Sequence, residues 1–205
     1  MANTAAQFGF KHVGFLPGYA PDYQLTGRGG VLLSTYSTQI GFGDPIMKLN
    51  STTMQIIQGT GALATTYPIM GIFQGCSYVP SGGGLPQWSP FWPGSAASNA
   101  TAYWIEAPGA IFMAAALNTA ISSGSIGQGV NFTTGAPTTT GGGYSIATLD
   151  QATISTTAAG TTFNNLPFKV VSLYPGVGNG SDPTTAFNWV WVTFNFQTYR
   201  YGSVF

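Results

Sequence analysis

The segment AFNWVWVTFNFQTY, from Ala186 to Tyr199, constrains the fold more than any other stretch of the chain. Side chains alternate between the two faces of a β-strand, so a strand with one solvated face alternates apolar and polar residues. Here both faces are apolar: one carries Phe187, Trp189, Trp191 and Thr193, and the other carries Val190, Val192, Phe194 and Phe196. Both faces must therefore be covered, either by sheets and loops of the same chain or by another protein.

Short apolar segments separated by turn-forming residues continue this strand pattern through most of the chain. Such segments begin at Val31, Pro45, Thr53, Ile69, Thr101, Tyr144 and Phe168, and glycine or proline clusters lie between many of them. Amphipathic helices do not alternate with these segments, which argues against a parallel α/β fold. The pattern predicts an all-β protein, an antiparallel β-sandwich or barrel of jelly-roll-like type, with at most one short helix. The most helix-like segment, 110–122, is predicted as a strand to about Ala116 followed by a short helical turn.

The N-terminal 30 residues differ from the remainder, because their aromatic residues are spaced by glycine and proline. Phe8, Phe10 and Phe15 lie in this segment, and Gly9, Gly14 and Pro17 disfavour a regular helix through them. We therefore predict an extended arm over 1–30, with an edge strand plus a loop as the alternative. Residues 31–205 are predicted to form a single β-rich domain.

Charge is scarce along the whole chain. Charged residues make up 5% of it, against about 25% in a typical protein. Five basic and five acidic residues balance to a net charge of zero, which removes the electrostatic basis for binding nucleic acid or an anionic membrane. No apolar run reaches the roughly 18 residues of a membrane-spanning helix. The first residues lack the pattern of a secretion signal, and one cysteine excludes an intrachain disulfide.

Residue types that carry chemistry are few and dispersed. The chain has one histidine, His12, and one cysteine, Cys76, so a Cys–His nucleophile pair is conceivable, with a buried structural cysteine as the simpler interpretation. No Cys/His cluster has metal-ligand spacing, and no acidic loop has the pattern of a calcium site. We therefore expect no catalytic residues, no metal and no cofactor, and we expect the chain not to be an enzyme.

Aromatic residues are the remaining candidates for a binding role. Trp88, Phe91 and Trp92 lie between prolines in PQWSPFWPG. Aromatic side chains on such a loop can stack on a sugar or contact a partner protein. The alternative is that they fill one end of the β-structure.

An ordered set of motifs resembles a family of small structural proteins of tailed bacteriophages, the capsid decoration or cement proteins. The set consists of FGFKHVGFLPG, GDPIMKL, GIFQGCSYV followed by WSPFWPG, AYWIEAPGAIF, TLDQATI, and LPFKVVSLYPG leading to AFNWVWVTFNFQTYRYG. These motifs run in order over nearly the whole chain. The last strand departs from the family pattern by having Trp and Phe where polar residues are more usual.

The resemblance implies a β-rich protein on the exterior of an icosahedral phage capsid, made in the bacterial cytoplasm. Its partners would be the major capsid protein and further copies of itself, as a dimer or trimer, and no nucleic acid or membrane. The expected contact residues are Phe8, Phe10, Phe15, Trp88, Phe91, Trp92, Trp189 and Trp191. A head fibre base, a tail protein and a carbohydrate-binding module remain alternatives.

Overall fold

The computed structural model describes residues 2–18, 30–32, 35–48, 56–64, 67–94, 97–138, 142–154 and 166–197. This part of the chain is all-β, as predicted, with two antiparallel sheets. The strands are β1 (Lys11–Phe15), β2 (Gly30–Leu32), β3 (Pro45–Lys48), β4 (Ile56–Gln58), β5 (Gly71–Pro80), β6 (Gln87–Ser89), β7 (Ala97–Ile105), β8 (Ala110–Ala115), β9 (Gly129–Thr133), β10 (Thr148–Asp150), β11 (Phe168–Leu173) and β12 (Trp189–Phe194).

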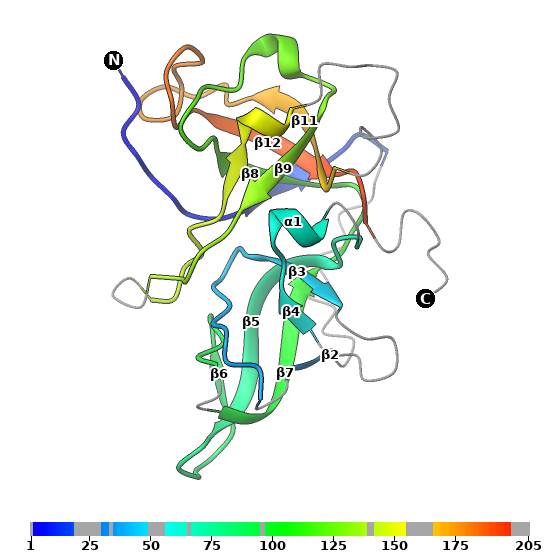
Figure 1. The fold of residues 1–205 in the computed structure, drawn as a ribbon, viewed down its shortest axis with the longest axis vertical. Helices are drawn as coiled ribbons and strands as arrows, with labels where there is room; N and C mark the ends of the chain where they lie inside the picture. Colours follow the sequence, from blue (N-terminus) through cyan, green and yellow to red (C-terminus); the bar gives the residue numbers. More distant parts are fainter. Residues whose placement is uncertain are drawn as a thin grey trace.

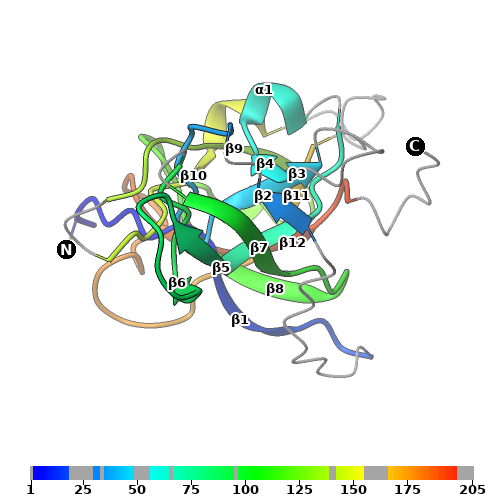
Figure 2. The same ribbon diagram turned by 90° about the horizontal axis from the view of Figure 1, so that it is seen from below.

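The first sheet has the strand order β1-β8-β12-β11-β9-β10, and the second has the order β2-β7-β5-β3-β4, with β6 added to β5. Figure 1 shows the first sheet in the upper part of the molecule and the second in the lower part, and Figure 2 shows the same elements from below. Both sheets are open, so the arrangement is that of a sandwich and not of a closed barrel.

Helical structure is limited to single turns in the described residues. They are α1 (Gly61–Ala64) and two 3-10 turns, Ser123–Ser125 and Gln151–Thr153. The segment that begins at Ala110 forms strand β8 and ends at Ala115, close to the predicted end at Ala116. It lies between β1 and β12, and its Ala110, Phe112 and Ala114 side chains pack in the core. The turn follows later than expected, at Ser123.

The predicted N-terminal arm contains one strand, and its other described residues, 2–10 and 16–18, lie outside the strands and helices. Lys11–Phe15 forms the edge strand of the first sheet and pairs with β8 in antiparallel register, Lys11 opposite Met113 and Phe15 opposite Ala110. This segment contains no proline, so its backbone can pair regularly apart from a bulge between His12 and Gly14. For Lys11–Phe15 the structure therefore agrees with the alternative prediction of an edge strand. Residues 19–29 lie outside the described part.

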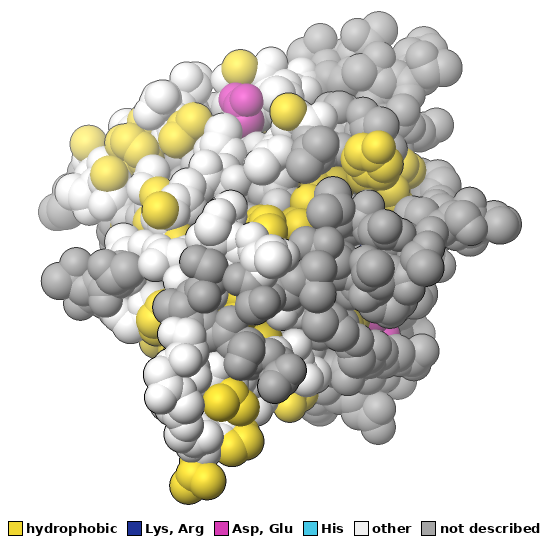
Figure 3. Space-filling view, turned by 60° about the horizontal axis from the view of Figure 1, so that its bottom comes forward, with side chains coloured by type: hydrophobic (Ala, Val, Ile, Leu, Met, Phe, Trp, Pro, Cys, Tyr) yellow, Lys and Arg dark blue, Asp and Glu magenta, His cyan; other side chains and the backbone are white. Residues whose placement is uncertain are grey.

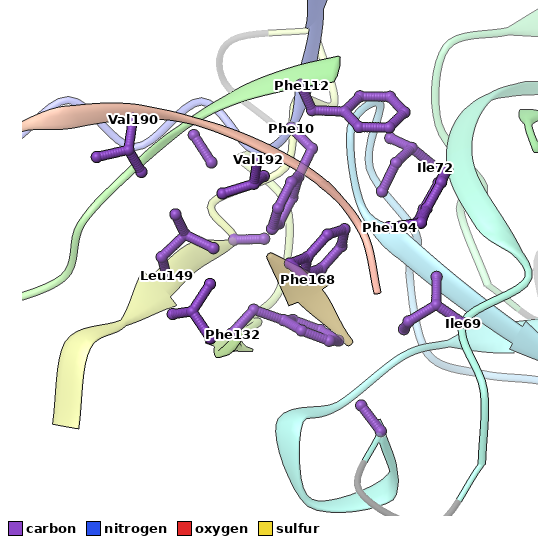
Figure 4. Close-up of a cluster of buried hydrophobic side chains, with 14 of the residues drawn as sticks. Phe10, Ile69, Ile72, Phe112, Phe132, Leu149, Phe168, Val190, Val192 and Phe194 are labelled. Carbon is purple, nitrogen blue, oxygen red and sulfur yellow. The ribbon is translucent and has the colours of Figure 1, made fainter. Parts of the chain in front are cut away.

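A first core cluster fills the space beneath the first sheet and also includes residues of the second sheet. Phe168 lies at its centre, stacked on Phe10 at 4.4 Å between ring centroids and on Phe194 at 5.9 Å. Figure 4 shows these rings with Phe112, and Ile72 of β5 on the side of the second sheet. The two sheets therefore share one apolar contact region.

A second core cluster lies within the second sheet and contains Phe73, Trp92 and Trp104, all fully buried. The partly buried Tyr36 packs against both clusters, and its hydroxyl oxygen accepts a hydrogen bond from the Gln58 backbone N–H at 2.9 Å. Tyr36 thus links the two clusters.

Removal of the central ring tests this description of the core. Phe168→Ala should lower the free energy of unfolding by about 3–5 kcal/mol, because a fully buried aromatic ring is lost and a cavity remains. Urea unfolding followed by circular dichroism measures the change. Val177→Ala is the control, since this side chain is 94% exposed and its loss should change stability by less than about 0.5 kcal/mol. Equal stability of both variants would contradict the assignment.

Candidate interaction surfaces

The apolar outer side of β12 is partly covered by the chain itself. Val190, Val192 and Phe194 point into the first core cluster, whereas Trp189 and Trp191 lie on the opposite face and are half-buried. The Trp189 ring contacts Phe8 and Tyr174, each at 5.1 Å between ring centroids. At this end of the strand, therefore, the second apolar face is covered by loops and by the N-terminal segment.

A hydrogen-bond clamp holds the N-terminal segment against the loop that precedes β12. The Asn3 side chain donates to the Asp182 carbonyl at 2.8 Å and accepts from the Gly180 N–H at 2.9 Å. The Thr4 N–H donates to the Asn179 side chain at 2.7 Å. These bonds span about 180 positions of sequence and fix the segment on which Phe8 approaches Trp189.

Trp191 lies in the middle of the outer face of the first sheet, in a row formed by Lys11, Met113, Trp191 and Ser172 across four adjacent strands. Its indole Nε1 and that of Trp189 are shielded from solvent and have no hydrogen-bond acceptor among the described residues. Beside this row Val13 is 44% exposed. Both tryptophan donors therefore lack acceptors, and the exposed apolar surface at Val13 distinguishes the middle of this outer face from the Trp189 end.

Phe10 and Phe15, which were expected to contact a partner, pack within the chain. Phe10 is fully buried between Phe132 and Phe168, and its N–H donates to the Gly43 carbonyl at 2.9 Å. Phe15 is partly buried against the first core cluster. For Phe10 the expected contact role is corrected to a core role, because its ring packs on Phe132 and Phe168 in the first core cluster.

The three loop aromatics do not form one patch. Trp92 is fully buried, its indole N–H donates to the Tyr36 carbonyl at 3.2 Å, and it belongs to the second core cluster. Phe91 is half-buried and packs directly on Gly143. The expected contact role of Trp92 is therefore corrected to a core role. This residue agrees with the alternative prediction, that the loop aromatics fill the interior of the β-structure.

Trp88 is the loop aromatic that faces solvent, with 61% of its surface exposed. It lies on β6, which forms a hairpin with the end of β5, and Leu85 in the hairpin loop is 86% exposed. Figure 3 shows this side of the molecule, where hydrophobic side chains lie at the lower end and no Lys or Arg is visible among the described residues. The sequence singled out Trp88 but not Leu85, although the flanking GGG and proline mark an exposed turn.

His12 and Cys76 lie in different sheets and make separate contacts. The Cys76 thiol donates to the Phe91 carbonyl at 3.5 Å, and burial raises its pKa to about 12, which disfavours the nucleophilic thiolate. The His12 ring packs against Phe15 at 4.9 Å and Phe112 at 5.8 Å, and burial lowers its pKa. This arrangement does not form a nucleophile–base pair.

A fully buried carboxylate, Asp44, is the strongest polar feature of the structure. It accepts hydrogen bonds from the Gly41 N–H at 2.7 Å, from the Gln58 side chain at 2.8 Å and from the Ser145 hydroxyl. Burial raises its pKa to about 6, although these three hydrogen bonds favour the ionised form. The sequence indicated only a turn at Asp44-Pro45, because Gln58 and Ser145, which donate to the carboxylate, are distant from it in the chain.

An open depression of about 410 Å³ lies beside α1 and is lined by Thr60, Gly61, Ala62, Asn131, Phe132, Thr133, Thr134 and Asp150. Several of its polar groups are already used within the chain. The Asn131 amide donates to the Gly61 carbonyl at 2.8 Å, and the Asp150 carboxylate accepts from the Ala152 N–H at 3.1 Å. Its polar groups therefore serve the local structure of β9, β10 and α1.

The described residues contain no group of three or more His, Cys, Asp or Glu side chains placed to hold a metal ion. Nor does any helix in this part of the chain have the length and apolar character needed to cross a membrane.

Comparisons with known proteins identify no relative. The chain matches no protein-family model, no curated protein and no solved structure.

The Asp44 network predicts a pH dependence of stability. The pKa of Asp44 is 3.8 in its ordinary state and about 6 in the fold, so between these values the folded chain binds more protons than the unfolded chain. The free energy of unfolding should therefore be highest below about pH 4 and fall by ~3 kcal/mol as the pH rises to about 6. Asp44→Asn should remove this slope.

Urea unfolding at a series of pH values measures this effect. Asp182→Asn is the matched control, since Asp182 is not buried and its pKa is lowered by hydrogen bonds from Thr184. An identical slope in the wild-type chain and Asp44→Asn would exclude Asp44 as its origin.

Proposed function

We propose that this chain is a structural protein of a bacteriophage particle, which binds the outer surface of an icosahedral capsid and cements neighbouring capsomers. The ordered motifs that resemble the decoration proteins support the proposal, as does the all-β fold. The structural observation that carries it is the outer face of the first sheet around Trp191, where apolar side chains remain partly exposed.

This outer face offers the chemistry of a protein interface. Val13 is exposed, Met113 and Trp191 are half-buried, and their strands β1, β8 and β12 carry no acidic residue. Burying apolar area contributes about 25 cal/mol per Å² before the costs of association. A capsid subunit would therefore cover the part of the outer face, around Trp191, that the chain itself leaves exposed.

The mechanism of cementing is mechanical. A protein that bridges two capsomers adds buried area across the seam between them, and many such bridges on a closed shell act together against internal pressure. Few charged groups are present to titrate or to be screened, so binding should depend only weakly on salt.

A binding experiment with a matched pair of variants tests the surface. Val13→Asp should weaken binding to purified capsids that lack this chain by about tenfold or more, because a carboxylate would be desolvated at the interface. Val177→Asp places the same charge at another exposed position and should bind as the wild-type chain does. Co-sedimentation over a concentration series measures both, and equal loss in the two variants would contradict the assigned surface.

Particle stability tests the role itself. Particles without this chain should release DNA at a lower temperature than complete particles, and adding the purified chain should restore the difference. Equal heat resistance with and without the chain would exclude a cementing role. Imaging of the labelled chain on particles separates the capsid from the alternatives of a head fibre base or a tail component.

Self-association is a further part of the proposal, because cement proteins of this kind act as dimers or trimers. Light scattering over a dilution series of the purified chain should give the mass of a dimer or trimer at low concentration. A monomer throughout would mean that the uncovered outer face is reserved for the capsid.

A further inference from the structure

We propose that the second sheet carries a binding site for a neutral carbohydrate, centred on Trp88 and separate from the surface assigned to the capsid. The site is the outward face of β5, β6 and β7. Its members are the outward-pointing residues Gly75, Ser77, Trp88, Thr101 and Tyr103, here called the Trp88 face.

The strand register places these five residues together on one face. Ser77 pairs with Trp88 on one side and with Thr101 on the other, and Gly75 pairs with Tyr103. The alternate residues Cys76, Ala102 and Trp104 are buried in the second core cluster. The Trp88 face is therefore turned away from the core, with aromatic rings and hydroxyl groups on adjacent strands.

Glycine at position 75 fixes the position of the Trp88 ring. The indole lies so close to this backbone that a Cβ at Gly75 would be 2.8 Å from Cζ2 of Trp88 and 2.7 Å from the Ser89 carbonyl oxygen. Gly75 also has a φ of 132°, which other residues rarely adopt. One side of the ring thus contacts the sheet, while most of its surface faces solvent.

A ring held in this way forms a stacking platform. It has little freedom to lose when a ligand binds, so binding costs less conformational entropy than it would on a mobile side chain. The absence of a side chain at Gly75 makes room for the Trp88 ring, and Tyr103 pairs with Gly75 on the neighbouring strand.

Charge decides the class of ligand. Strands β5, β6 and β7 and the hairpin loop contain no Asp, Glu, Lys or Arg. Phosphate groups and nucleic acid would require cations at the surface. A neutral sugar instead offers C–H faces, which stack on aromatic rings, and hydroxyl groups, which bond to Ser, Thr and Tyr hydroxyls.

Binding of neutral oligosaccharides to the purified full-length chain tests the proposal. The probes are hexamers of glucose in α- and β-linkage, of xylose, of mannose and of N-acetylglucosamine, titrated by isothermal calorimetry and saturation-transfer NMR. We expect at least one to bind, and Trp88→Ala to weaken its binding by about tenfold, which is the scale of one lost aromatic contact. Trp88→Phe should retain part of the affinity, and raising salt should change little.

Tyr67→Ala is the matched control, because Tyr67 is an exposed aromatic residue outside the Trp88 face, with 51% of its surface exposed. This variant should bind as the wild-type chain does. A measurement on the wild-type chain does not depend on whether a variant folds. A bound sugar should protect the tryptophan fluorescence of the chain from quenching by acrylamide, because Trp88 is the exposed tryptophan of the described part.

The proposal is overturned if none of the probes binds, or if Trp88→Ala binds the sugar as tightly as the wild-type chain. It is also overturned if Trp88→Ala loses capsid binding and no sugar binding is found, because the hairpin is then a protein contact. The sugar titrations use the free chain without capsids, so their outcome is independent of the proposed cementing role; the capsid assay on Trp88→Ala is run separately.

Discussion

Burial of the Asp44 carboxylate, whose partners among the described residues are hydrogen-bond donors and not cations, is the constraint around which the two sheets are organised. Removing a charge from water is costly, and the cost is offset here by donors from separate parts of the chain. Gln58 comes from β4 of the second sheet, whereas Ser145 precedes β10 of the first. The Gln58 amide also donates to the Gly135 carbonyl at 3.1 Å. A polar network thus ties together the same two sheets that share the apolar core.

Glycine contacts around this network show how closely the segments approach. At Gly9, which has a φ of 68°, a Cβ would lie 2.5 Å from Cβ of Ser145, and at Gly41 it would lie 2.7 Å from the Ser145 backbone nitrogen. The N-terminal segment therefore passes directly over the network before Phe10 enters the core. This close passage holds Gly9 and Phe10 against the body of the protein directly before β1 begins at Lys11.

The two proposed surfaces lie on different sheets, so the two proposed binding roles do not compete for the same residues. The outer face of the first sheet, around Trp191, is suited to a protein partner because exposed apolar side chains lie there on regular strands. The Trp88 face is suited to a neutral ligand because it combines aromatic rings with hydroxyl groups and no charge. A particle protein arranged in this way could bind its shell through one sheet and present the other outward.

The sequence by itself determined the all-β class, most strand positions and the apolar character of both faces of β12, because these depend on local periodicity and turn residues. It also identified Trp88 as a candidate, although it grouped Trp88 with Trp92. Only the tertiary structure decided that Trp92 is buried, that Phe10 is a core residue and that Phe8 and Tyr174 cover Trp189. It also decided that Gln58 and Ser145 meet Asp44. These are contacts between residues far apart in the chain, and the local pattern is the same whichever partner a side chain finds.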